Sequence, residues 1–355
     1  MRSCGSFKRA SVALGVLCGL AALVWGQAGG AEAGEALKKV RFGWFPAAHT
    51  AHVFAAKHHG VFEKEGLDVE LIRAQAGIQL MSTLIAGDTD MSVNHLGGVA
   101  QLHKQGKRPI LVYAYTSRPT QDLAVRNEVL AKLGVSRADP LAKRLAALKG
   151  LKMGITSPRS ESDLFTRYLL KKGGLDPDRD ATIISIGGPA NLVAALKTGQ
   201  IDSLLQTPPI PTVPVVEGFG QVLISFSQGD VPEFRNFPYQ AVVLMREYAE
   251  KNPDVVVRFI RALMRADANL RTHREGTLDA LAAFLGGDRK ALNGAYDSLI
   301  EAWTRPEASA LTKEIVEHEM TMWRQVGVLD FAATAAEGEM WTNTYRDRAF
   351  AGLGR

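Results

Sequence analysis

A segment near the middle of the chain combines several hydroxyl groups with one cation, a combination that suits an anion. It runs Thr156-Ser157-Pro158-Arg159-Ser160-Glu161-Ser162 and joins an expected strand to an expected helix. The first amides of a helix have no partner inside it and carry the positive end of its dipole, so they attract anions. Arg159 could add a bidentate contact to a carboxylate, sulfonate or phosphate. The alternative is plain capping of the helix by Ser160 or Ser162, with Arg159 in solvent.

Six of the eight histidines fall in the amino-terminal part of the chain, namely His49, His52, His58, His59, His95 and His103. Imidazoles suit zinc, copper or nickel, so His49, His52 and His95 could form a metal site. No Asp, Glu or Cys stands with them at a familiar ligand spacing, and we therefore expect no metal and no other cofactor. His49 or His95 could instead donate a hydrogen bond to a ligand, or serve as a structural histidine. Either could also pair with Glu161 or Asp163 as acid and base, but no motif fixes such a pair, so we do not expect an enzyme.

The elements that would position these residues alternate between short β-branched or aromatic runs and amphipathic stretches. Strands are expected at 40–45, 68–72, 91–94, 110–116, 123–126, 152–156, 182–186, 201–205, 221–226 and 240–245. Helices that stop at glycines are expected at 50–59, 79–85, 162–172 and 191–197. This succession predicts an α/β fold with mixed, mostly parallel sheets covered on both faces. From about Tyr248 the pattern is helical, and we expect this tail to pack against one lobe.

Two β-rich stretches flank a self-contained α/β unit at about 141–219, so the chain would cross twice between two lobes and form a hinge. We expect lobe I at 34–117 and 225–355, with the helical tail, and lobe II at 118–224.

Ligands of open α/β sheets lie beyond the carboxyl ends of the strands, and this rule selects the candidate binding residues. They are Trp44, Phe45, His49, Gln75, Gly77, Asn94, His95, Thr116, Thr156, Ser157, Arg159, Ser160, Gly188, Asn191, Gln206 and Thr207. Trp44 and Phe45 could form an aromatic wall for an organic ligand, although alternation along the strand places one of them in the core.

The first 33 residues have the pattern of a secretory signal peptide. Arg2, Lys8 and Arg9 precede an apolar stretch at 10–24, and Ala31-Glu32-Ala33 offers a cleavage site. A membrane anchor is the alternative, but about 15 apolar residues fall short of the ~20 that span a bilayer. We therefore expect export to the periplasm.

Both cysteines, Cys4 and Cys18, lie in this segment, so the exported chain would have no disulfide and no thiol chemistry. A lipid anchor at Cys18 is an alternative, but a lipoprotein signal has a small residue before its cysteine, and this chain has Leu17 there. We therefore do not expect that anchor. The 42 basic and 37 acidic residues give a formal charge of +5 that is spread along the chain without a basic stripe. Nucleic acid is therefore not expected as a partner.

Four motifs follow one another in a fixed order. They are A-x-x-x-G-x-F-x-x-x-G-L-x-V-E at 56–70, G-D-x-D at 87–90, L-K-G-x-x-x-G-I-T-S-P at 148–158 and A-L-x-x-G-Q-I-D at 195–202. Together they closely resemble the solute-binding proteins of ABC importers for nitrate, sulfonate, taurine and bicarbonate, and the related family that binds thiamine pyrimidine precursors. The resemblance runs from about residue 40 to 271. It implies a type II periplasmic binding protein whose two lobes close on a small ligand and hand it to a membrane permease.

Particular residues bear on the ligand within this resemblance. The related families usually have Gly where Arg159 stands, so Arg159 either adds a charged partner for the ligand or has no role. The pyrimidine-precursor group has W-x-P, which Trp44-Phe45-Pro46 matches, and we therefore favour Trp44 over Phe45 as the residue facing the ligand. In that group a polar stretch follows, but this chain has Ala47-Ala48 there. This difference makes a pyrimidine precursor a less favoured ligand.

The resemblance thus implies a monomeric periplasmic protein that captures a small organic anion, such as a sulfonate or an aromatic carboxylate. Its partners would be the transmembrane subunits of an ABC permease with a cytoplasmic ATPase. Uptake of nitrate or a pyrimidine precursor remains an alternative. So does a sensor subunit that reports its ligand to a membrane kinase, because its fold would be the same.

Overall fold

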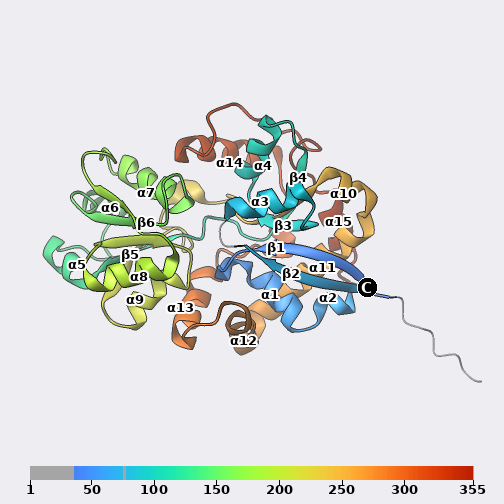
Figure 1. Cartoon of the computed structure of the whole chain (residues 1–355), viewed down its shortest axis with the longest axis horizontal. Coiled ribbons are helices and arrows are strands. Elements are labelled where there is room, and N and C mark those ends of the chain that lie inside the picture. Colours follow the sequence, from blue (N-terminus) through green and yellow to red (C-terminus); the bar gives the residue numbers. More distant parts are fainter. Residues whose placement is uncertain (1–35, 75–76, 355) are drawn as a thin grey trace, which may run out of the picture. The chain divides into compact units, whose positions relative to one another are not determined.

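The computed structural model describes residues 36–74 and 77–354 (Figure 1). The expected signal peptide and the candidate Gln75 lie outside these residues. Within them, no helix has both the length and the apolar character needed to cross a membrane.

The first sheet contains five strands in the order β2-β1-β3-β10-β4. Their bounds are Lys38–Trp44 for β1, Leu67–Arg73 for β2, Met91–Asn94 for β3, Pro109–Ala114 for β4 and Ala241–Met245 for β10. β1 runs parallel to β2 and β3, whereas β10 is antiparallel to both β3 and β4. Strands β1 to β4 therefore run in the same direction, and β10, the last of the five in the sequence, runs in the opposite direction.

The second sheet repeats this plan with the order β7-β6-β8-β5-β9. Its strands are Asp122–Arg126 for β5, Lys152–Ile155 for β6, Thr182–Ser185 for β7, Ser203–Gln206 for β8 and Gly220–Ser225 for β9. β6 is parallel to β7 and β8, and β5 is antiparallel to β8 and β9. The single reversed strand of each sheet adjoins a place where the chain passes from one sheet to the other. The α/β class with mixed sheets is thereby confirmed, and all ten expected strands are present.

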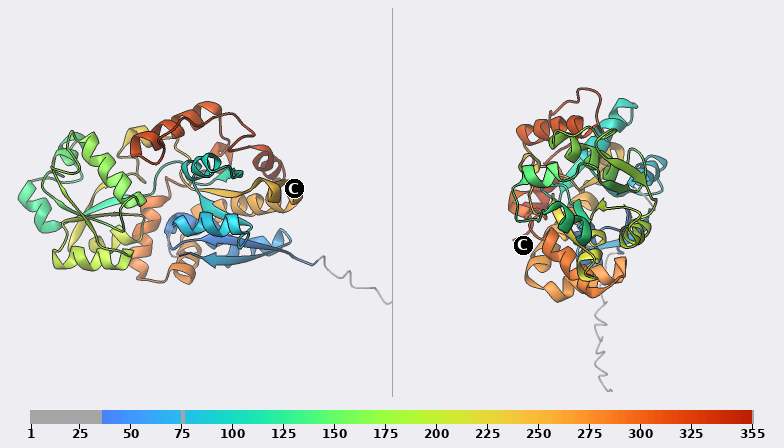
Figure 2. Two further views of the ribbon diagram at one scale, coloured as in Figure 1. Left: turned by 45° about the horizontal axis from the view of Figure 1, so that its top comes forward. Right: turned by 90° about the vertical axis from the view of Figure 1, so that its left-hand side faces the viewer.

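Helices lie on both faces of the two sheets (Figures 1 and 2). Those up to the end of the second sheet are α1 (Ala51–His58), α2 (Val61–Lys64), α3 (Gly77–Ala86), α4 (Leu96–Lys104), α5 (Asn127–Leu133), α6 (Leu141–Ala146), α7 (Glu161–Lys172), α8 (Pro189–Thr198) and α9 (Val213–Val216). The tail adds α10 (Arg246–Lys251), α11 (Pro253–Thr272), α12 (Arg274–Leu285), α13 (Arg289–Leu299), α14 (Lys313–Val326) and α15 (Thr344–Ala351).

Strand β1 shows how the sequence specifies the two faces of the first sheet. Phe42 stacks on Phe259 of α11, with ring centroids 5.2 Å apart. Gly43 points to the opposite face, where an added Cβ would meet Leu80 of α3 at 3.1 Å. The alternation of side chains along a strand explains both contacts. It also places Trp44 on the same face as Phe42.

The helical tail, which was expected to pack against one lobe, contacts elements of both sheets. α11 and α12 pack on α1, but α13 also contacts α9 and α14 also contacts α7. The Thr212 hydroxyl donates to the Ala291 carbonyl at 2.9 Å, and the Ser298 hydroxyl donates to the Asp122 carboxylate at 2.5 Å. The apolar pattern of the tail helices predicts that each is buried on one face, but it does not determine which element packs against that face. The expected lobe boundaries stay predictions.

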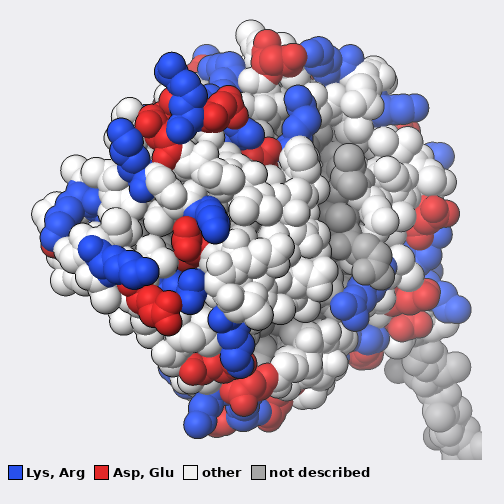
Figure 3. Space-filling view, turned by 60° about the vertical axis from the view of Figure 1, so that its left-hand side comes forward, with Lys and Arg blue, Asp and Glu red and all other residues white. Residues whose placement is uncertain are grey.

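Charges of both signs are mixed on the face in Figure 3, which brings the second sheet forward. Lys and Arg alternate with Asp and Glu along its border, and its middle is mostly uncharged. This face therefore has no broad basic surface.

Candidate functional site

The carboxyl ends of strands from both sheets meet directly. The Ala48 amide, just beyond β1, donates to the Pro208 carbonyl beyond β8 at 3.1 Å. Thr120 lies between them, with its hydroxyl 3.0 Å from His49 Nδ1 and 3.4 Å from the Thr207 hydroxyl. The structure thus brings the expected site residues His49 and Thr207 together through Thr120.

His49 is a fully buried polar group of this junction. It belongs to a single 3₁₀ turn, Ala48–Thr50, and its side chain has no exposed surface. Burial lowers the pKa of His49 to about 3, so the imidazole is neutral near pH 7. Nδ1 faces Thr120, whereas Nε2 is buried and has no hydrogen-bond partner among residues 36–74 and 77–354. Leaving such a group unpaired costs about 1–3 kcal/mol.

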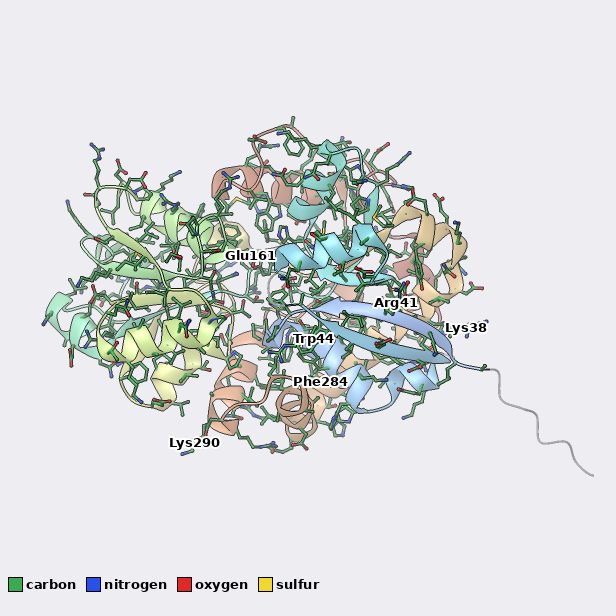
Figure 4. All side chains as sticks on the ribbon, viewed as in Figure 1. Lys38, Arg41, Trp44, Glu161, Phe284 and Lys290 are labelled. Carbon is green, nitrogen blue, oxygen red and sulfur yellow. The ribbon has the colours of Figure 1, made fainter. Side chains whose placement is uncertain are left out.

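A second polar cluster, around Glu161 at the start of α7, also links the two sheets (labelled in Figure 4). Gln121 Nε2 donates to Glu161 Oε2 at 3.1 Å and to the Tyr239 hydroxyl at 2.7 Å. The Tyr239 hydroxyl donates in turn to Glu161 Oε2. His95 Nε2 lies 3.4 Å from Glu161 Oε1. Burial raises the pKa of Glu161, and the hydrogen bonds from Tyr239 and Gln121 act against that rise.

His95 is held by contacts on three sides. As the N-cap of α4 it accepts a hydrogen bond at Nδ1 from the Gly98 amide at 3.1 Å. Its ring stacks on Trp323 of α14 at 4.3 Å, and burial lowers the pKa of His95 to about 4. Trp323 Nε1 donates to Glu319 Oε1 at 2.9 Å, and burial raises the pKa of Glu319 to about 8.

The two aromatic residues after β1 take different positions. Trp44 is 4% exposed and packs edge-on against Phe54 and Phe284, with centroids 5.0 Å and 6.3 Å away (Figure 4). Phe45 is half-buried, with its ring 5.1 Å from that of His49. Phe45 is therefore the aromatic residue nearest to the sheet junction. Contact of either ring with a ligand stays a prediction.

The loop after β6 is more open. Ser157 and Arg159 are exposed, whereas Thr156 and Ser160 are half-buried and share the Ser162 hydroxyl at 3.1 Å and 2.9 Å. Ser160 caps α7 by accepting from the Asp163 amide at 3.4 Å. Arg159 has a φ of 65°, a left-handed conformation that glycine adopts most easily. This conformation gives a physical reason for a glycine at this position in related proteins.

The remaining candidates occupy the following positions. Asn94 accepts the His95 amide at 2.9 Å, and the Thr116 hydroxyl accepts the Gln240 amide at 2.7 Å. Gly188 and Asn191 are exposed at the start of α8, which has no acidic residue in its first turn. Gln206 ends β8 half-buried, and Gly77 begins α3. None of these contacts identifies a ligand.

The histidines considered for a metal site do not converge. His52 Nε2 contacts Asp267 at 3.2 Å and packs against Tyr115 and Trp303, away from the junction, whereas His49 and His95 both lie 6.3 Å from the Tyr239 ring. Across residues 36–74 and 77–354, no group of three or more His, Cys, Asp or Glu could hold a metal ion.

Sequence reasoning missed Thr120, Gln121 and Tyr239 as site residues. All three lie where the chain crosses between sheets, immediately before the expected strands at 123–126 and 240–245. The rule applied to the sequence selects residues at the carboxyl end of a strand, whereas these three residues precede a strand. The crossing segments also border the junction, so their polar residues were a usable signal.

The chain is similar to binding proteins of known solutes. It is 27% identical over 244 residues to the nitrate/nitrite binding protein NrtA of Nostoc, a match that covers 64% of this chain and 53% of NrtA. The solved aliphatic sulphonate binding protein SsuA of Escherichia coli superposes with a TM-score of 0.66 at 19% identity, covering 87% of this chain and 99% of SsuA. The desulfurization enzyme DszB superposes with a TM-score of 0.61 at 13% identity, covering 88% and 99%.

These similarities define the class of the protein. Its fold is that of the periplasmic binding proteins. Residues 33–286 match the model of the NMT1-like family, and the chain belongs to that family. The chain spans about half the length of NrtA.

Proposed function

We propose that the protein is the periplasmic substrate-binding component of an ABC importer and captures a small organic anion, such as a sulfonate or an aromatic carboxylate. The binding proteins NrtA and SsuA support this class of function. We further propose that the ligand lies where the strand ends of the two sheets meet, and that hinge closure delivers it to the permease and its cytoplasmic ATPase.

The observation that carries this proposal is the buried Nε2 of His49, which has no hydrogen-bond partner among the residues that the structure describes. If the Thr120 hydroxyl donates to Nδ1, the neutral ring carries its proton on Nε2. An oxygen of the ligand would accept that proton and remove the cost of an unpaired buried donor. The half-buried ring of Phe45 beside His49 would cover the organic part of the ligand.

The same geometry argues against acid-base catalysis, although DszB, an enzyme, has a similar fold. His95 uses Nδ1 as an acceptor from Gly98, so its proton is on Nε2 and points to Glu161. His49, with its pKa lowered to about 3, is a poor base near neutral pH. Neither imidazole is placed to take a proton from a substrate, and we propose a binding protein rather than an enzyme.

Calorimetric titration of the chain from Gly34 tests this proposal, with ethanesulfonate, benzoate, nitrate and a hydroxymethylpyrimidine as ligands. We expect an organic anion to bind and His49→Gln to weaken it about tenfold, the loss of one hydrogen bond of ~1.4 kcal/mol. His58→Gln is the matched control, because His58 is exposed at the end of α1, and it should bind as the wild type does.

Equal affinity of the wild type and His49→Gln would refute the site. Binding of nitrate or the pyrimidine alone would replace the proposed ligand by one of those alternatives. A pull-down from membranes with this protein as bait distinguishes an importer component from a sensor subunit. An importer component should recover permease subunits, whereas a sensor subunit should recover a membrane kinase. Size-exclusion chromatography at micromolar concentration checks the proposed monomer.

A further inference from the structure

A cavity of about 650 Å³ is lined by α2, α11 and α15, and α11 contacts both of the other helices (Figure 1). Its charged lining residues are five cations and two carboxylates: Lys64, Arg258, Arg261, Arg265, Arg348, Glu65 and Asp254. Cavities of about 300–1,000 Å³ are typical of small-ligand sites. The excess of cations favours an anionic ligand.

Three of the arginines come from one face of α11. Arg258, Arg261 and Arg265 are spaced by three and four residues, which places them one above another along the helix. The Glu65 carboxylate is 3% exposed, and its Oε2 accepts from Arg261 Nε at 2.8 Å while its Oε1 lies 2.9 Å from Arg265. This buried carboxylate holds two guanidinium groups in fixed positions.

Arg258 has no such partner. It is half-buried, and it makes no ion pair or hydrogen bond with any residue in the part of the chain that the structure describes. Its Nη1 lies 3.0 Å from the position of a Cβ on Gly66, whose φ of 74° itself requires glycine. Arg348 on the rim is paired with Asp254 at 2.7 Å. The charge of Arg258 is therefore left to face the cavity.

The cavity is distinct from the proposed ligand site. Gly66, beside which Arg258 Nη1 lies, accepts a hydrogen bond from the Lys38 amide at the start of β1. The cavity thus borders the amino-terminal edge of the first sheet, whereas His49 and His95 follow the carboxyl ends of its strands.

We propose that this cavity, the arginine pocket, binds phosphoryl groups. A guanidinium presents two parallel N–H groups that match two oxygens of a phosphate, and several fixed guanidiniums suit its double charge. The phosphoryl group comes from a soluble phosphate compound or from the headgroup of an anionic phospholipid. The recognition is the same in either case, since Arg258 and its neighbours contact the phosphate oxygens.

The test uses the full chain and two probes. Calorimetry with inorganic pyrophosphate examines the soluble source, and sedimentation with phosphatidylglycerol vesicles against phosphatidylcholine vesicles examines the lipid source. We expect binding of at least one phosphoryl probe that weakens with added salt. Arg258→Gln should weaken it about tenfold or more, and because Arg258 makes no ion pair with any described residue the variant should fold.

Arg289→Gln is the matched control, since Arg289 lies on α13 and pairs with exposed Glu275 and Asp279, and it should bind as the wild type does. Arg348→Gln provides a second variant from another helix. Pyrophosphate binding should persist in His49→Gln. Failure of the arginine pocket can therefore be distinguished from failure of the proposed ligand site at His49. Absence of binding to both probes, or equal binding by wild type and Arg258→Gln, would overturn it.

Discussion

The carboxyl ends of the two sheets have the same strand plan and opposite surroundings. In the first sheet, His49 is fully buried, His95 is half-buried against Trp323, and burial lowers the pKa of each ring. In the second sheet, Ser157, Arg159 and Asn191 are exposed. The helical tail contributes to this difference, because Phe284 of α12 packs on Trp44 and Trp323 of α14 packs on His95. Strand order alone therefore does not determine how a binding surface is built.

The largest effect is expected from removing the tail side chain that packs on His95, which is Trp323 of α14. Trp323→Ala deletes a fully buried ring that contacts His95, Phe237 and Tyr239. We expect a loss of about 3–5 kcal/mol in the free energy of unfolding, measured with urea. The pKa of His95, followed by NMR, should rise from about 4 toward its ordinary value as water reaches the ring.

Ser157→Ala gives the matched comparison in the exposed loop of the second sheet. A surface change of this kind should alter stability by less than about 0.5 kcal/mol. Similar losses in Trp323→Ala and Ser157→Ala would mean that the two sheet ends do not differ as described.

The carboxyl group of Glu319 should make stability depend on pH. Its folded pKa of about 8 lies above the ordinary value of 4.5, so the protonated form stabilises the fold below pH 4.5, and this contribution disappears as the pH rises toward 8. Between pH 5 and 8 the wild type should lose about 3 kcal/mol more than Glu319→Gln, which keeps a neutral acceptor for Trp323.

Urea unfolding of both proteins at pH 5, 6.5 and 8 measures this difference. Glu314→Gln is a suitable control, because Glu314 is exposed on the same helix. Parallel pH profiles for the wild type and Glu319→Gln would show that Glu319 is ionised in the folded protein.

The smallest effect is expected at Arg159 in the second sheet. Its φ of 65° strains any residue with a side chain by about 1 kcal/mol. Arg159→Gly should therefore stabilise the protein slightly, by about 0.5 kcal/mol after the greater freedom of glycine in the unfolded chain is counted. Urea unfolding measures the gain, and a loss of 1 kcal/mol or more would contradict it. A tenfold loss of ligand affinity in this variant would show that the guanidinium reaches the ligand.

The sequence by itself determined the local structure. Alternating β-branched runs and glycine stops predicted all ten strands, because strand periodicity and helix termination depend on near neighbours. The same alternation, applied to Val40 and Phe42, places Trp44 in the core, yet the W-x-P resemblance led to the opposite preference. Among the candidate residues, His49, His95 and Thr207 could be predicted from the sequence, because each follows the carboxyl end of an expected strand.

Only the tertiary structure decided which groups meet. Glu161 joins Tyr239, 78 residues away, and Asp122 joins Ser298, 176 residues away. No local pattern encodes such pairs, because each depends on how the two sheets and the helical tail pack together. The arginine pocket has the same origin, since its lining comes from helices that are distant in sequence and is completed by burying a single carboxylate beneath two guanidinium groups.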